Sequence, residues 1–395
     1  MSGPAPRRHA ALPALLWANV VAGAGTFMPA ALLVPIANDL GASIAATGQA
    51  LTVFAIAMAI GAPLLAAATA GVDRRTLLVS VLALFGLLTA GSALVASLAA
   101  MLAVRAAAGL VAGLITPQAA TVAGLLVPPE RRASAVAYVF NGYALSIVVG
   151  LSLGAWLGDA FGWRAALAGV AAMSLLGAAW VGASVPRGLT VPPLGLAAAG
   201  AFARDGRLRA ILAVTVLQAT GQFLIYSYLG PLLERQAGIE PRHAGLAFAA
   251  LAATGLVGGL LAMRRLAVDP PGRVASAGLA AMAVGFASWP AIEWSGGAPW
   301  ALAWVALAWG TPCFAVNMAQ QARLVQARPA LASLSVALNS SGMFVGQAAG
   351  TAAAGALIHG GAAAALAPVG AALIVLALAV SLRIDRAAAH ARAAG

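Results

Sequence analysis

About a dozen apolar runs, each roughly 20 residues long, follow one another along this chain of 395 residues. A helix of about 20 residues crosses the hydrocarbon core of a bilayer, because each residue adds about 1.5 Å along the helix axis. Apolar residues make up 62% of the chain, and a soluble protein of this size could not bury so many of them. The sequence therefore predicts an all-α polytopic membrane protein with twelve transmembrane helices.

The predicted spans form two groups of six. They cover residues 11–37, 44–70, 76–96, 101–127, 134–158 and 163–185 in the first group, and 210–233, 243–263, 274–292, 300–320, 331–358 and 361–382 in the second. The longest polar connection, which is rich in Pro, Gly and Arg, separates the groups. We therefore expect an N-terminal six-helix bundle over 1–185, a cytoplasmic linker over 186–209 and a C-terminal six-helix bundle over 210–395.

Arginine collects in alternate gaps between the spans. All 22 basic residues are Arg, and 18 of them fall in segments on the same side as the N-terminus. Arg164, Arg235 and Arg242 fall in the opposite loops, and Arg105 lies inside a span. Because arginine-rich loops stay in the cytoplasm, we expect both termini there. The net charge of +12 then reflects membrane topology, and we expect no nucleic-acid partner.

The fifth and eleventh spans resemble each other. Each opens with a serine, passes through an asparagine, and continues with glycines at intervals of four. The residues concerned are Asn141, Gly150, Gly154 and Gly158 in the fifth span, and Asn339, Gly342, Gly346 and Gly350 in the eleventh. Small residues at this interval let helix backbones approach closely. Two related halves also predict a substrate site at mid-membrane between them.

Three segments carry a resemblance to a known family. Residues 105–113, Arg-Ala-Ala-Ala-Gly-Leu-Val-Ala-Gly, are similar to the RxxxGxxxG signature in the fourth span of the major facilitator superfamily, although Ala108 replaces a frequent Gln. Residues 150–159 resemble the antiporter signature GxxxGPxxGG, with Ala155 in place of the Pro. Residues 338–350 resemble the sugar-efflux branch. The chain is identified as a member of this superfamily, in its bacterial drug/H⁺-antiporter and sugar-efflux branch.

The resemblance implies a secondary transporter in the bacterial cytoplasmic (inner) membrane. Such a protein would export a small molecule, drug-like, sugar or nucleoside-like, by alternating access and proton antiport, as a monomer and without a cofactor. Uptake by symport or facilitated diffusion on the same fold stays open. A membrane-embedded enzyme or a receptor is a third alternative, but the chain has no HExxH sequence. Cys313 is the single cysteine, so we expect no disulfide and no metal site.

Arg105 is the one arginine that lies well inside a predicted span. An Arg at the centre of a lone span costs about 2.5–3.5 kcal/mol on insertion scales, so it needs a partner or a water-filled cavity. We expect Arg105 to organise substrate or proton coupling, while Gly109 and Gly113 of the same signature pack helices. The alternative is a structural clamp bonded to backbone carbonyls.

The loop between the second and third spans departs from the family pattern GxLxDRxGRR. When the pair Arg74 and Arg75 is aligned, Ala70 occupies the expected Asp position and Asp73 falls three residues late. Asp73, Arg74 and Arg75 are therefore gating candidates with altered spacing. Proton coupling commonly uses a carboxylate within the membrane, and no Asp or Glu lies at the middle of a predicted span. Asp39, which closes the first span, is the coupling candidate.

Gln218, Gln222 and Tyr226 recur at i, i+4 and i+8 in the seventh span, with Thr215 three residues earlier. These positions share one helical face, and a face of amides cannot point at lipid without leaving them unsatisfied. We expect a cavity wall that binds a neutral or weakly cationic substrate. Interhelical hydrogen bonds, worth about 0.6 kcal/mol each, are the alternative. Further cavity candidates are the isolated amides Asn19, Gln49, Gln118, Asn141, Asn317 and Asn339.

Overall fold

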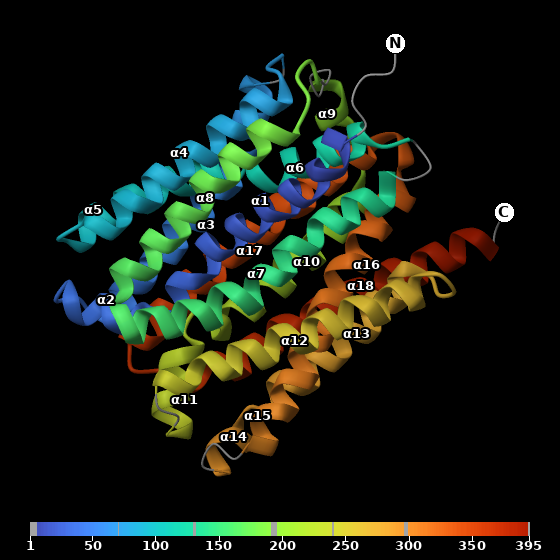
Figure 1. The fold of residues 1–395 in the computed structure, drawn as a ribbon. Helices are drawn as coiled ribbons and strands as arrows, with labels where there is room; N and C mark the ends of the chain where they lie inside the picture. The colour runs from blue at the N-terminus through green and yellow to red at the C-terminus, as the bar shows by residue number, and fades with distance from the viewer. Residues whose placement is uncertain are drawn as a thin grey trace. The chain divides into compact units, whose positions relative to one another are not determined.

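The computed structural model describes residues 6–69, 71–128, 132–190, 196–238, 241–295 and 299–393, and within these ranges all regular structure is helical (Figure 1). Ala70, the residue at the expected Asp position, lies outside the described residues. The chain divides into two compact units, Met1–Pro193 and Leu194–Gly395. The predicted all-α class is confirmed.

Each unit contains six of the predicted spans. Unit 1 comprises α1 (Pro6–Ala31), α2 (Leu33–Asp39), α3 (Ile44–Ala68), α4 (Arg74–Leu94), α5 (Leu98–Ala112), α6 (Ile115–Leu126), α7 (Arg132–Phe161) and α8 (Trp163–Ser184). Unit 2 comprises α9 (Leu196–Arg204), α10 (Gly206–Tyr226), α11 (Leu229–Ala237), α12 (Pro241–Leu266), α13 (Pro271–Ala287), α14 (Pro290–Trp294), α15 (Pro299–Val305), a π-helical turn (Ala306–Gly310), α16 (Thr311–Ala327), α17 (Ala332–His359) and α18 (Leu366–Ala393). The predicted linker 186–209 includes α9 and the first turn of α10.

Prolines explain why four predicted spans are interrupted. Proline has no N–H for the carbonyl four residues earlier, and its ring clashes with that carbonyl. The proline and the residue four before it are Pro35 and Ala31, Pro117 and Gly113, Pro231 and Ser227, and Pro312 and Ala308. The first three pairs mark the ends of α1, α5 and α10. In the fourth pair, Ala308 lies in the π-helical turn and Pro312 lies in the first turn of α16. The predicted spans cover these four breaks, which apolar runs alone do not reveal.

The two units repeat one set of helix pairings. In unit 1, α1 packs on α7, α3 on α5 and α4 on α8, and in unit 2, α10 packs on α17, α12 on α16 and α13 on α18. Figure 1 shows α4 and α8 running side by side. Equivalent glycines mark equivalent contacts, since Gly61 of α3 lies against the backbone of Leu110 and Gly258 of α12 lies against the backbone of Thr311. Each unit is therefore a copy of the same six-helix pattern.

The glycine ladders lie at helix contacts inside the units. Gly109 and Gly113 of the Arg105 signature face α3, Gly150 and Gly154 of α7 face α1, and Gly158 of α7 faces Leu32 just after α1. Gly342, Gly346 and Gly350 of α17 face α10. A Cβ atom on Gly346 would lie 2.6 Å from the carbonyl oxygen of Val216, which is closer than real Cβ contacts. These glycines let the paired backbones approach, as small residues do in membrane helices generally.

The outer surface of each unit is apolar. Seven helical segments of the described residues are long and apolar enough to cross a bilayer, by length and composition alone. Large apolar side chains such as Leu64, Leu87, Leu176 and Leu260 are exposed. Exposed apolar side chains along whole helices are expected where lipid, rather than water, is the solvent.

Candidate functional site

Two amides of α10 and the thiol of α16 form a hydrogen-bonded group in unit 2. Gln218 Nε2 donates to Gln222 Oε1 over 2.7 Å, and Cys313 Sγ donates to the same oxygen over 3.1 Å. Gln218 is 1% exposed, and its oxygen Oε1 has no hydrogen-bond partner. A buried acceptor without a donor costs about 1–3 kcal/mol, so this oxygen offers a place for a ligand N–H or O–H group.

Aromatic rings extend this group along α10. The ring of Tyr226 meets that of Trp309 edge to face, with centroids 5.9 Å apart, and Trp309 meets Phe286 at 5.3 Å. Trp309 lies in the π-helical turn, whose Ala306 carbonyl accepts a hydrogen bond from Thr254 Oγ1 over 2.8 Å. We call Gln218, Gln222, Tyr226, Trp309 and Cys313 the amide–aromatic wall. The side chains predicted from the sequence as one stripe on α10 thus lie with a π-helical turn, a feature that is frequent at functional sites.

Several other predicted amides hold helices together. Asn339 of α17 accepts a hydrogen bond from Thr215 Oγ1 of α10 over 2.7 Å, and Asn19 of α1 donates to the Val139 carbonyl of α7 over 3.0 Å. Asn19 Oδ1 and Asn317 Oδ1 have no hydrogen-bond partner. Gln49 is half-buried and Asn141 is exposed. The isolated amides are therefore spread through both units, whereas those of the wall are brought together.

Arg105 is buried in unit 1, with 1% of its surface exposed. Its Nη1 donates to the carbonyl oxygen of Gly25 on α1 over 3.0 Å, and its guanidinium lies 3.9 Å from the ring centroid of Phe54 on α3. Nε and Nη2 have no hydrogen-bond partner. The side chain therefore has the carbonyl contact expected of a clamp, and it also keeps donors that are free to bind a further group.

Asp73 caps α4 and ties it to the segment after α8. Its carboxylate accepts hydrogen bonds from the backbone N–H groups of Thr76, Gly188 and Leu189, at 3.0, 2.6 and 3.0 Å. Partial burial alone would raise the pKa of Asp73, but these hydrogen bonds stabilise the carboxylate and hold the pKa below its ordinary value. Asp73 is thus a local brace within unit 1, despite its altered spacing.

The two arginines after Asp73 differ in their surroundings. Arg74 is buried, and its Nη1 donates to Gln118 Oε1 of α6 over 3.1 Å. Its backbone N–H donates to the Leu189 carbonyl over 2.8 Å. Arg75 is half-buried. Gln118, predicted as a cavity residue, is therefore the partner of a predicted gating residue.

Asp39 lies at the end of α2 in an ion pair with Arg164 of α8. Both side chains are more than two-fifths exposed, at 43% and 44%. Arg164 also donates to the Val95 carbonyl over 3.1 Å, which joins the ends of three helices of unit 1. Exposed ion pairs of this kind contribute about 0–1 kcal/mol. Asp39 therefore takes part in a weak surface contact between helix ends.

Sequence reasoning missed a further buried arginine, in addition to Arg105 and Arg74. Arg323 and Asp385 were expected in cytoplasmic segments, yet Arg323 is 4% exposed and its Nη2 lies 2.7 Å from Asp385 Oδ1. Gln320, one helical turn before Arg323, is also buried. A glutamine and an arginine at i and i+3 near the end of a span were the available signal.

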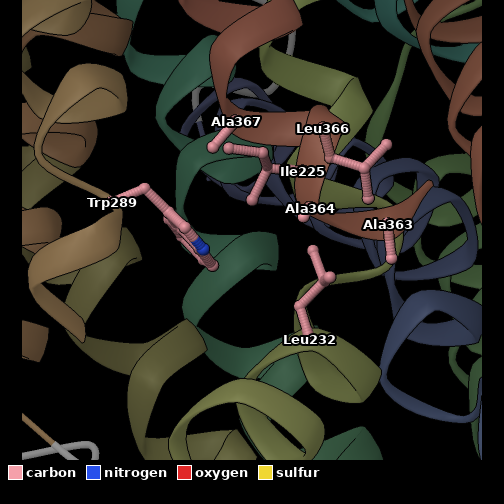
Figure 2. A pocket seen from close by; sticks show the side chains of 7 residues that line it. All are labelled: Ile225, Leu232, Trp289, Ala363, Ala364, Leu366 and Ala367. Atoms are coloured by element: carbon pink, nitrogen blue, oxygen red, sulfur yellow. The ribbon is translucent and has the colours of Figure 1, made fainter. Parts of the chain in front are cut away.

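Unit 2 also contains a small apolar cavity, shown in Figure 2, and no residue of the wall lines it. It is lined by Ile225, Leu232, Trp289, Ala363, Ala364, Leu366 and Ala367. It encloses about 10 Å³, which is too small for a substrate, and an apolar lining gives a water molecule few partners. We assign no binding role to this cavity.

The comparisons with known proteins agree with this architecture. The family model of the Major Facilitator Superfamily matches residues 15–351. The chloramphenicol resistance protein of Streptomyces lividans is 29% identical over 347 residues, which cover 86% of this chain and 87% of that protein. The purine ribonucleoside efflux pump NepI of Escherichia coli is 30% identical over 217 residues, 54% of each chain.

Other matches are partial or concern the fold alone. The transcription regulatory protein OpdE of Pseudomonas aeruginosa is 32% identical over 62% of this chain, and the chain spans 61% of that relative's length. The crystal structure of a D-xylose–proton symporter superposes with a TM-score of 0.76 at 15% identity, over 94% of this chain and 97% of that one. The family match covers most of the chain and both units repeat one six-helix pattern, so this chain belongs to the Major Facilitator Superfamily.

Proposed function

We propose that this protein exports a small neutral or weakly cationic molecule from the cytoplasm by alternating access, driven by inward proton flow. The observation that supports this proposal is the amide–aromatic wall of unit 2. Its five side chains carry no net charge, and the oxygen Gln218 Oε1 lacks a donor. A substrate with an apolar ring and an N–H or O–H group would match both the aromatic and the amide part of the wall.

Two relatives support export as the direction, because one is named for chloramphenicol resistance and another for purine ribonucleoside efflux. The arginine asymmetry supports a cytoplasmic location for both termini in the inner membrane. We further propose that a single chain is the working unit and that the proton gradient is its only energy source. Binding between repeats that change their exposure in turn is the general route for such transporters.

Transport in everted vesicles tests the proposal. Chloramphenicol and purine ribonucleosides are offered singly, with and without a pH gradient. We expect one of them to accumulate in vesicles that contain the protein, and a protonophore to abolish that accumulation. Accumulation driven by the gradient in right-side-out vesicles would assign uptake instead.

A matched pair of variants connects the flux to the wall. Gln222→Leu removes an amide of the wall, and Gln326→Leu makes the same change at an exposed position of α16. We expect only Gln222→Leu to raise the KM of the transported compound, by about threefold to tenfold, if one ordinary hydrogen bond is lost. Equal KM values for both variants would remove the wall from the substrate path.

A further inference from the structure

An arginine at the end of α16 fastens that helix to α18. Arg323 Nη2 donates to Asp385 Oδ1 over 2.7 Å and to the Ser381 carbonyl over 3.0 Å, and Nη1 donates to Ser381 Oγ over 2.9 Å. Ser276 of α13 donates to Asp385 Oδ2 over 3.2 Å and shares a 2.8 Å hydrogen bond with Ser381. Three helices of unit 2 therefore meet at one guanidinium.

This contact is built into the interior of the unit. Arg323 and both serines are buried, while the Asp385 side chain keeps 33% of its surface exposed. Gly272 of α13 leaves room for the carboxylate, because a Cβ atom there would overlap Asp385 Oδ1. A buried guanidinium held by a carboxylate and two further acceptors has a defined orientation, unlike an arginine in an exposed pair.

The same helix is bound to α10 on its other side. Gln320, one turn before Arg323, donates from Nε2 to the Ile211 carbonyl over 2.9 Å and to Thr215 Oγ1 over 3.3 Å. Cys313, two turns before Gln320, donates to Gln222 over 3.1 Å. Residues seven apart on a helix lie on one face. One face of α16 therefore contacts α10 at two positions along its length, through Cys313 and through Gln320.

We propose that Arg323 and Asp385 are positioning residues of the transport site. By fixing the rotation of α16 against α18, they aim Gln320 and Cys313 at α10 and so hold the two amides of the wall in their observed orientation. This inference rests on the proposed function of the wall, but its geometry has a readout that needs no substrate.

The native Cys313 supplies that readout, because it is the single cysteine of the chain and is buried at the wall. The rate of its reaction with N-ethylmaleimide is measured on the purified full-length protein. We expect Arg323→Gln to speed the reaction about tenfold, the factor that corresponds to releasing one ordinary hydrogen bond. Arg323→Lys should return the rate to within about threefold of the native value, because an ammonium group keeps the charge and three donors.

A second set of variants tests whether Arg323 acts through α16. Gln320→Leu should speed the reaction as Arg323→Gln does, and the double variant should match the single ones, since both release the same helix. Gly272→Ala should have the same effect by displacing the carboxylate without removing a charge. Arg273→Gln breaks an exposed ion pair with Asp269 in the same unit, and it should leave the rate unchanged.

Two outcomes overturn the inference. One is an unchanged Cys313 rate in both Arg323→Gln and Gly272→Ala. The other is a rate increase in the double variant of Arg323→Gln and Gln320→Leu that equals the product of the two single increases. If Arg323→Gln does not fold, Gly272→Ala decides alone. A normal flux in Gln222→Leu would instead count against the proposed function, and it would leave the positioning result standing as a property of unit 2.

Discussion

The guanidinium of Arg105 donates a hydrogen bond to the carbonyl oxygen of Gly25, four residues before Pro29. Proline cannot donate to the carbonyl four residues earlier, so the Gly25 carbonyl lacks the usual helical donor four residues later in α1. The arginine that is costly to place in a membrane therefore meets a carbonyl that a proline leaves without a donor. The ring of Phe54 covers the same guanidinium at 3.9 Å. The buried cation therefore supplies a hydrogen bond to the carbonyl from which Pro29 removes the helical donor.

The first prediction concerns this pair. Arg105→Ala should reduce transport at least about tenfold, and the unpaired Gly25 carbonyl should cost about 1–3 kcal/mol of stability. Pro29→Ala restores an N–H that can bond Gly25 within α1. Adding Pro29→Ala to Arg105→Ala should therefore recover stability but not transport.

Thermal unfolding of purified protein and flux at equal membrane abundance separate these effects. Full flux in Arg105→Ala would reduce the arginine to a structural clamp. A stability that stays low after Pro29→Ala is added would show that the Gly25 carbonyl is not the group left unsatisfied.

The second prediction concerns the glycine ladder of α17. Gly346→Ala should destabilise the protein by about 1–3 kcal/mol, because the added methyl group meets the Val216 backbone and α17 must move away from α10. Gly259→Ala on α12 is the matched control, since its nearest neighbour there is Met318 Sδ at 3.7 Å. Gly259→Ala should be neutral or stabilising by up to about 1 kcal/mol. Equal unfolding temperatures for the two variants would contradict the close packing of α10 and α17.

Most of the fold could be predicted from the sequence because membrane helices need long apolar runs and arginine-poor alternate loops. The helix breaks could not be predicted from hydropathy, because hydropathy carries no information on backbone hydrogen bonds. They follow instead from single prolines such as Pro117 and Pro231, which remove a hydrogen bond without changing apolar character.

The candidate site was predicted less completely. The stripe of Gln218, Gln222 and Tyr226 depends on helical periodicity alone, which the sequence displays. The contribution of Cys313 and the pairing of Arg323 with Asp385 depend on which helices become neighbours, and no spacing within one helix reveals that. Arg323 was assigned to a loop because charge counts do not distinguish a buried arginine from a solvated one.

The third prediction concerns Asp73 and pH. Its pKa is lowered by hydrogen bonds from Thr76, Gly188 and Leu189. Its contribution to stability is therefore present above the ordinary value of 3.8 and is lost as the pH falls through the lower folded-state pKa. Asp73→Asn puts an NH2 group in place of one accepting oxygen, so it should destabilise the protein at pH 7 by about 0.5–1.5 kcal/mol, as for one ordinary hydrogen bond lost. The difference should shrink as the pH falls below about 4. A difference that is constant from pH 7 to the acid limit would contradict the ionised cap.

The fourth prediction concerns topology. Thr190→Cys, placed in the predicted cytoplasmic connection, should resist membrane-impermeant thiol reagents in intact cells and react after permeabilisation, in a Cys313→Ser background. Ala160→Cys, at the predicted outer end of α7, should react in both cases. Both positions are exposed, so a difference reports on the side of the membrane. The reverse pattern would overturn the orientation inferred from arginine.

The last prediction uses Cys313 to detect substrate at the amide–aromatic wall. The thiol donates to Gln222, and Gln222 also accepts from Gln218, so a ligand that bonds Gln218 Oε1 lies beside the sulfur. The compound that the vesicle assay identifies should slow the reaction of Cys313 with N-ethylmaleimide, and half-maximal protection should fall near its KM. Gln218→Leu removes the unpartnered oxygen, and it should shift the half-maximal concentration upward by about threefold to tenfold. Gln326→Leu, which is remote from the sulfur on an exposed face of α16, should not shift it. Protection that is identical in Gln218→Leu and the native protein would mean that the substrate does not use this oxygen, and the wall would then be interhelical bonding alone.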